Sequence, residues 1–135
     1  MLKQRNFRNY QVWKDAINLV SDIYIMTQSF PSHETYGLGS QMQRASISIP
    51  SIIAEGSAKP KDSDFARFLD IALGSSYELE TQITIAHNIN YIDEETRDQL
   101  LNKIIDIQKQ LTLFIGKNQE FLVFRFSFFV FRKKI

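Results

Sequence analysis

The sequence contains no cysteine and only two histidines among its 135 residues. Without cysteine, disulfide bridges and thiol chemistry are excluded. No apolar run reaches the ~20 residues that a membrane-spanning helix needs. The N-terminal residues also lack the apolar run of a signal peptide. We therefore expect a cytoplasmic protein without a membrane span.

Charge of either sign is modest, since the chain carries 16 basic and 15 acidic residues and a net charge of +1. Hydrophobic residues make up 44% of the chain, which is typical of a globular protein. The acids outnumber the bases by two over residues 1–118, whereas residues 119–135 carry four bases and one acid. This balance argues against strong nucleic-acid binding by a single subunit.

Apolar residues recur with helical spacing in four segments, over about 10–29, 38–56, 62–89 and 93–116. The segments are joined by short loops. We therefore predict an all-α protein, an antiparallel up-down-up-down four-helix bundle over residues 1–118. The predicted boundary residues are Ser40 with Gln43 as a capping box, Gly56 as a C-terminal cap, Asp62 or Ser63, Asp93, and Gly116.

Pro50 lies inside the apolar pattern of the second segment. A proline there removes one backbone hydrogen bond and crowds the preceding turn, at a cost of ~3 kcal/mol. Either the helix is kinked at Pro50 and continues, or it stops and restarts. The apolar register continues across the proline, which favours the kink.

The third segment carries two partly apolar faces, which indicates that one packs inside the subunit and the other meets a neighbouring subunit. We therefore expect a homo-oligomer. Gly74 in a helix interior costs ~1 kcal/mol relative to alanine, and close backbone approach to another helix would offset this cost. The candidate interface residues are Ile71, Gly74, Ser75 and Ile85.

A metal-binding bundle would need inward glutamates and Glu-x-x-His pairs. The two histidines, His33 and His87, follow Phe30 and Thr84 at that spacing, so we predict no metal site and no cofactor. The sequence also has no nucleophile motif and no phosphate-binding loop. No small-molecule substrate is evident.

Several polar residues fall on otherwise apolar stretches of the second and third segments. The carboxylates among them could form an acid pair for hydrolysis, or they could pair with arginines between the two helices. Buried charges need such partners, and we favour the second interpretation. The predicted inter-helix network is Arg44, Glu55, Arg67, Glu78 and Glu80.

Basic residues near the N-terminus and in the break before the third segment could contact phosphates, although such residues are usually solvated surface. A ring of subunits would repeat them around an axis and add their contacts. The candidates are Lys3, Arg5, Arg8, Lys14, Lys59 and Lys61. Tyr10, Trp13 and Tyr36 could stack on bases, but Trp13 is better explained as core.

Residues 119–135 hold six of the 11 phenylalanines and fit no helical pattern. This tail has three interpretations: a divergent end without function, a docking or membrane-surface segment ending in basic residues, or a contact with a neighbouring subunit. The first is favoured.

Four stretches together resemble the small bacterial four-helix-bundle proteins encoded in intervening sequences of 23S rRNA genes, often labelled S23 ribosomal proteins. They read VWKDAINLVSDIY, FP, YGLGSQMQRASISIPSIIAEG and FARFLDIALGSSYELETQ. The resemblance covers about residues 7–118. This sequence departs from the family at Gly39, where the family usually has Thr or Ala, and after Asn118.

The resemblance implies a homopentamer and kinship with the accessory variability determinant of diversity-generating retroelements, a basic pentamer that binds nucleic acid and its reverse transcriptase. It implies no catalytic residues. We therefore expect a non-enzymatic oligomeric scaffold associated with RNA or a reverse transcriptase-like partner. A protein-only interaction module is the alternative, and a hydrolase using Glu55, Glu78 or Glu80 is less favoured.

Overall fold

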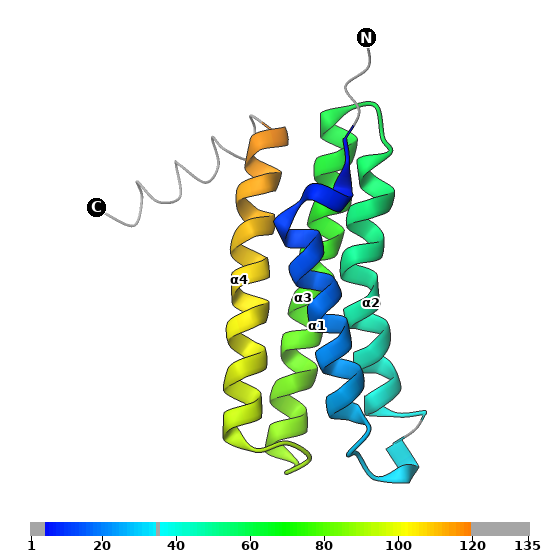
Figure 1. The fold of residues 1–135 in the computed structure, drawn as a ribbon, viewed down its shortest axis with the longest axis vertical. Helices are drawn as coiled ribbons and strands as arrows, with labels where there is room; N and C mark the ends of the chain where they lie inside the picture. Colours follow the sequence, from blue (N-terminus) through cyan, green and yellow to red (C-terminus); the bar gives the residue numbers. More distant parts are fainter. Residues whose placement is uncertain (1–4, 35, 120–135) are drawn as a thin grey trace, which may run out of the picture.

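The computed structural model describes residues 5–34 and 36–119. Its four long helices pack side by side, and successive helices run in opposite directions (Figure 1). This confirms the all-α four-helix bundle. The helices are α1 Gln11–Thr27, α2 Leu38–Ser57, α3 Asp62–Asn88 and α4 Glu94–Asn118, with short 3-10 turns at η1 Phe7–Asn9 and η2 Ser32–Glu34.

The two ends of the bundle carry different connections. At the upper end in Figure 1 lie the N-terminal segment, the α2–α3 turn and the C-terminus of α4. At the lower end lie the α1–α2 and α3–α4 connections. The tail was predicted over residues 119–135, and all of it except Gln119 lies outside the described residues. Within those that are described, no helix is long and apolar enough to cross a membrane.

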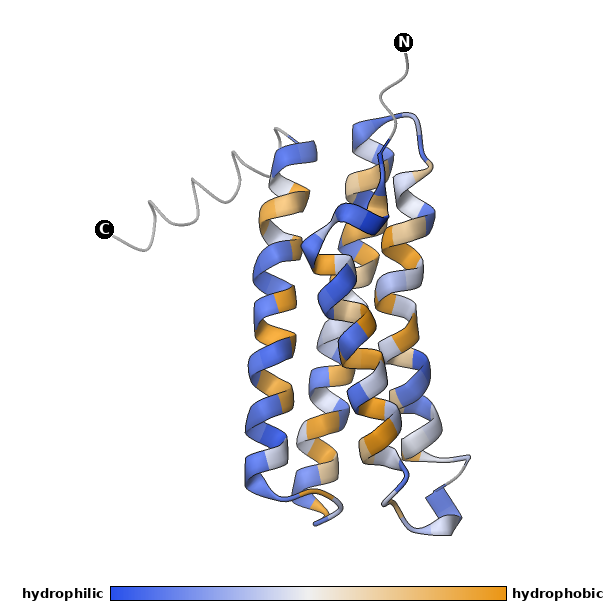
Figure 2. Ribbon diagram, in the orientation of Figure 1, coloured by the Kyte–Doolittle hydropathy of each residue, from blue (hydrophilic) through white to orange (hydrophobic). Residues whose placement is uncertain are grey.

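One apolar stripe from each helix is buried in a single core, and Figure 2 shows these stripes as hydrophobic bands between hydrophilic ones. Each large aliphatic side chain buried in this way contributes about 1.5–3 kcal/mol relative to exposure. Trp13 is half-buried and packs against this core, as predicted. The fully buried large side chains are Phe65, Leu19, Ile23, Met42, Ile49, Ile53, Leu69, Leu79, Ile83, Ile104, Ile107 and Leu111.

α2 is one continuous helix through Pro50, so the stop-and-restart alternative is wrong. Pro50 is buried, and its ring contributes apolar surface while its missing N–H leaves the Ser46 carbonyl without its helical donor. Whether α2 bends at Pro50 stays a prediction.

Gly56 is not a helix cap, because α2 continues to Ser57. It is buried where α2 meets α3. A Cβ at this position would overlap the Cβ of Phe68 and lie 3.2 Å from a ring carbon of Phe65. The glycine is therefore required by the close approach of two helices. Gly74, by contrast, has no atom within 4 Å of a Cβ added there.

The start of α2 also differs from the predicted capping box at Ser40. The helix begins two residues earlier, and its Leu38 N–H donates to Glu34 Oε2 at 2.8 Å. Gln43 instead donates to Thr27 Oγ1 of α1 at 2.9 Å. A carboxylate four residues before the helix has replaced the expected hydroxyl cap.

The other predicted helix ends differ in outcome. Asp93 caps α4 as expected, by accepting from Thr96 N–H at 2.8 Å. Asp62 is the first residue of α3, and the preceding Lys61 holds the cap position without a side-chain hydrogen bond. α4 continues past Gly116 to Asn118.

Replacing Gly56 and Gly74 by alanine in turn tests the different roles of the two positions. Gly56→Ala should lower the free energy of unfolding by about 1–3 kcal/mol, because Phe68 must shift to admit the methyl group. Gly74→Ala faces open space in the subunit and should raise the free energy of unfolding of the monomer, measured below the concentration of self-association, by about 0.5–1 kcal/mol. Urea unfolding of both variants measures the difference. A stable Gly56→Ala protein would contradict the close contact.

Candidate assembly and contact surfaces

The predicted interface residues of α3 form an outward face that none of the described residues covers. Ile71 is 50% exposed and Ile85 is 43% exposed, while Gly74 lies between them on open surface. Ser75 is half-buried at the edge of this face. The close helix approach predicted for Gly74 is not made within the subunit. Ile89, 46% exposed, extends the face by one more turn.

Gln82 lies beside this face and is only 5% exposed. Its Nε2 lies 3.5 Å from Glu78 Oε1, a long hydrogen bond. Its Oε1 is buried and has no hydrogen-bond partner among the described residues. A buried acceptor left without a donor costs about 1–3 kcal/mol.

The predicted ion-pair network between α2 and α3 is not formed within the subunit. Arg67 pairs with Asp64 on its own helix at 2.9 Å, and Glu80 accepts from Gln108 of α4 at 2.8 Å. Arg44 and Glu55 are both exposed. Because their charges stay in water, they need no buried partner, and a surface pair would add little.

Arg5 is committed to the fold and is not a free phosphate contact. Its side chain is 7% exposed and donates to the Lys59 carbonyl oxygen and to Asp62 Oδ1. Its guanidinium also lies 4.7 Å from the centre of the Phe65 ring. Arg5 therefore ties the N-terminal segment to the α2–α3 turn.

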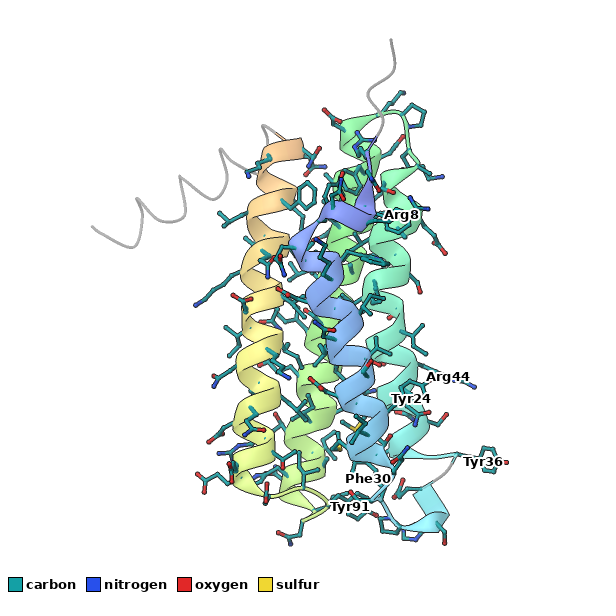
Figure 3. All side chains as sticks on the ribbon, viewed as in Figure 1. Arg8, Tyr24, Phe30, Tyr36, Arg44 and Tyr91 are labelled. Carbon is teal, nitrogen blue, oxygen red and sulfur yellow. The ribbon has the colours of Figure 1, made fainter. Side chains whose placement is uncertain are left out.

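The other basic candidates are more accessible. Arg8 is exposed and lies 4.5 Å from the ring centre of Phe7, and Figure 3 places it at the upper end of the bundle. Lys59 and Lys61 are exposed on the α2–α3 turn at the same end. Lys14 is exposed on the first turn of α1. Lys3 lies outside the described residues.

Two of the three aromatic residues considered for base stacking belong to the interior. Tyr10 meets Phe114 edge-on with ring centres 4.8 Å apart, and Trp13 meets Phe7 at 5.2 Å. Tyr36 is 94% exposed. Figure 3 shows Tyr36 at the lower end, far from Arg8. The basic residues and the free aromatic ring are therefore on separate parts of the molecule.

A hydrogen-bonded cluster at the lower end was not predicted. Tyr91 O–H donates to Glu34 Oε1 at 3.0 Å and lies 3.3 Å from His33 Nε2. Tyr91 also packs against Phe30 with ring centres 5.0 Å apart, side by side in Figure 3. Glu34 and Tyr91 lie 57 positions apart in the sequence, so no local spacing predicts their contact.

The cluster alters the pKa values of both of its titratable members. The Leu38 N–H and then the Tyr91 hydroxyl hold the pKa of Glu34 below its usual range. Burial, followed by the hydrogen bond to Glu34, raises the pKa of Tyr91. An ionised Glu34 therefore closes the α1–α2 connection onto the α3–α4 connection.

The described residues hold no group of three His, Cys, Asp or Glu side chains placed to bind a metal ion. His87 Nδ1 lies 3.2 Å from Arg97 Nη1, a contact in which this ring nitrogen accepts. A cleft between α1 and α4 is lined by none of the glutamates considered for hydrolysis.

Comparison with known proteins gives a match to the family model for the 23S rRNA-intervening sequence protein over residues 8–113. A solved structure from Bacteroides thetaiotaomicron is similar with a TM-score of 0.72 and 23% sequence identity. The likeness covers 77% of this chain and 97% of that one, which is described as a protein of unknown function from the S23 ribosomal protein family. The likeness supports the fold. No curated protein matches.

The depressed pKa of Glu34 gives the stability a defined dependence on pH. Because this pKa is lower in the folded than in the unfolded chain, its hydrogen bonds add stability above about pH 4.5, the ordinary value. The contribution is lost as the pH falls through the folded-state pKa. Glu34→Gln should therefore flatten the loss of stability between pH 5 and pH 3, measured as urea midpoints.

In the Glu34→Gln variant, Asp93 still contributes to the acid dependence of stability, because hydrogen bonds from Thr96 also hold its pKa low. Asp93→Asn removes that second contribution and keeps Glu34, so it is the matched comparison. An unchanged slope in Glu34→Gln would show that the carboxylate does not hold the two connections together.

Proposed function

The chain belongs to the family of 23S rRNA-intervening sequence proteins, and we propose that it acts as a non-enzymatic homo-oligomeric scaffold that associates with RNA. The proposal is carried by the outward face of α3, where Ile71 and Ile85 stay in water around an uncovered Gly74. Apolar side chains and a small residue on one face suit contact with another subunit.

Assembly by this face explains the cost that the subunit bears alone. A helix glycine without a close neighbour is unfavourable by ~1 kcal/mol. A second copy approaching Gly74 would offset this cost. The pentamer implied by the family resemblance is the specific assembly that we propose.

Association with RNA rests on the repetition of modest charge. One subunit offers Arg8, Lys14, Lys59 and Lys61 as exposed cations, with Arg5 engaged in the fold. Each phosphate contact releases counterions. The binding free energies of contacts repeated around a ring therefore add, and each contact multiplies the affinity. The family's link to 23S rRNA makes structured RNA the first ligand to test.

A protein-only interaction module is the second candidate. It is favoured by the excess of acids over bases in residues 1–118 and by the use of Arg5 inside the fold. In that case the partner, including a reverse transcriptase-like protein, would stay bound to the chain after nuclease treatment of a pulldown. Loss of the partner with nuclease would support the RNA scaffold.

Substitutions on α3 test the assembly. Ile71→Glu and Ile85→Glu should each weaken self-association by a factor of about 100 or more, because an unpaired buried charge costs several kcal/mol. Native mass spectrometry and light scattering at micromolar concentration should show a pentamer for the unaltered chain and smaller species for the variants. Leu113→Glu, a change at an exposed α4 residue, is the matched control.

A monomeric unaltered chain would remove the assembly from the proposal. Dissociation by Leu113→Glu alone would move the interface to α4. Circular dichroism of each variant separates loss of assembly from loss of fold.

The RNA contacts are tested by the salt dependence of binding. Each lost phosphate contact should lower the slope of log K against log salt by about 0.7–0.9. Lys14→Gln combined with Lys61→Gln should therefore lower the slope for structured RNA by more than one in the oligomer. Lys109→Gln, on the exposed surface of α4, should leave it unchanged. Affinity that is independent of salt would contradict phosphate contacts.

A further inference from the structure

A cleft of about 460 Å³ opens between the last turns of α1 and the start of α4. Its size is in the range of pockets that enclose a small ligand or a few side chains. The cleft lies at the lower end of the bundle, near the α3–α4 connection. The lining residues are Asp22, Ile25, Met26, Ser29, Tyr91, Ile92, Asp93, Thr96, Gln99, Leu100 and Lys103.

Part of this lining is apolar and open to water. Ile25 is 68% exposed at the edge of the cleft, and Met26 beside it is half-buried against the core. Ile92 and Leu100 form the back, at 9% and 5% exposure. A large aliphatic side chain this exposed next to a hollow is the arrangement that a docked apolar group would cover.

The surroundings of the cleft are acidic. Its rim carries Asp22 and Asp93, and the adjoining hollow on α4 adds Glu94, Glu95 and Asp98. Two cations lie among these five carboxylates. Lys103 pairs with Asp22, and Arg97 lies between Glu94 and Asp98. The surface is therefore left with an excess of negative charge, which favours a cationic occupant.

One segment of the chain has the matching composition. Residues 120–135 contain six phenylalanines and four basic residues against one acid, and the basic residues Arg132, Lys133 and Lys134 follow the last phenylalanine. Apolar groups followed by a cationic group match an apolar cleft followed by an acidic surface.

The same segment is long enough to reach the cleft. It follows Gln119, just after the end of α4 at the upper end of the bundle. Returning along α4 to Gln99 means covering 20 helical residues, about 30 Å at 1.5 Å each. An extended chain covers about 3.3 Å per residue, so about nine residues, as far as Phe128 in the sequence, are enough to span this distance. The chain as far as Arg132 is long enough to span the distance to the first turn of α4.

We propose that residues 120–135 occupy this cleft in the same chain, with phenylalanines against Ile25 and Leu100 and the basic residues against the carboxylates of α4. Docking removes apolar surface from water on both sides. It also occupies the cleft, so any other ligand of this surface must displace the segment. The contact is made within one subunit and is independent of the α3 face.

A disulfide trap tests this contact directly, because the native chain has no cysteine to interfere. The full chain carrying Gln99→Cys and Phe128→Cys should form an intramolecular disulfide at least tenfold faster than a control carrying Ser51→Cys and Phe128→Cys. Ser51 is exposed on α2, which is not among the helices that line the cleft. Non-reducing gels and peptide mass analysis measure the rates.

Glu95→Lys with Asp98→Lys should slow the Gln99 trap several-fold, and so should 0.5 M salt, which shortens the electrostatic range. Equal rates for the two cysteine pairs would overturn the proposal. A product that is mainly cross-linked dimer would overturn it as well, because the occupant would then be a second copy. Circular dichroism confirms that each variant is folded.

Discussion

The upper end of the bundle depends on the packing around Phe65, a fully buried ring near the start of α3. It lies against Gly56 of α2, and its ring meets Phe114 of α4 edge-on at 5.2 Å. Tyr10 stacks on it from the start of α1, and Arg5 covers its face. One side chain thus contacts every other helix or its flanking residues. A methyl group at position 56 would overlap Phe68 and crowd this ring, so the absence of a side chain there favours the packing.

The sequence predicts most of the fold, because the helical spacing of apolar residues in four segments and the short loops between them indicate a four-helix bundle. The sequence predicts the ends of the helices less well. Asp93 caps α4, as its residue type and position indicate. Ser40 fits the same local pattern, but α2 begins at Leu38, where Glu34 accepts the backbone N–H. A cap supplied by a carboxylate from a neighbouring turn is decided by loop geometry, which no residue pattern encodes.

The candidate surface residues also differ in how well the sequence predicts their positions and partners. The exposure of Ile71 and Ile85 follows from helical spacing and could be read from the sequence. The role of Arg5 could not, because its partners lie on the α2–α3 turn, more than 50 residues away. Glu80 likewise accepts a hydrogen bond from Gln108 of α4, where an arginine partner was expected. Spacing indicates which side of a helix a residue occupies, whereas its partner depends on how the helices are packed.

The contacts of Arg5 with the α2–α3 turn also affect the order in which parts of the chain unfold and fold. Contacts between consecutive helices join residues close in sequence and form early, whereas the pair of Arg5 and Asp62 must close a loop of 57 residues. The N-terminal segment has no buried residue in η1, and Arg5 provides its main attachment to the α2–α3 turn, so the segment can detach while the helices stay together. Its release uncovers one face of Phe65, and amide exchange in residues 6–10 would therefore be faster than in the helices beneath them.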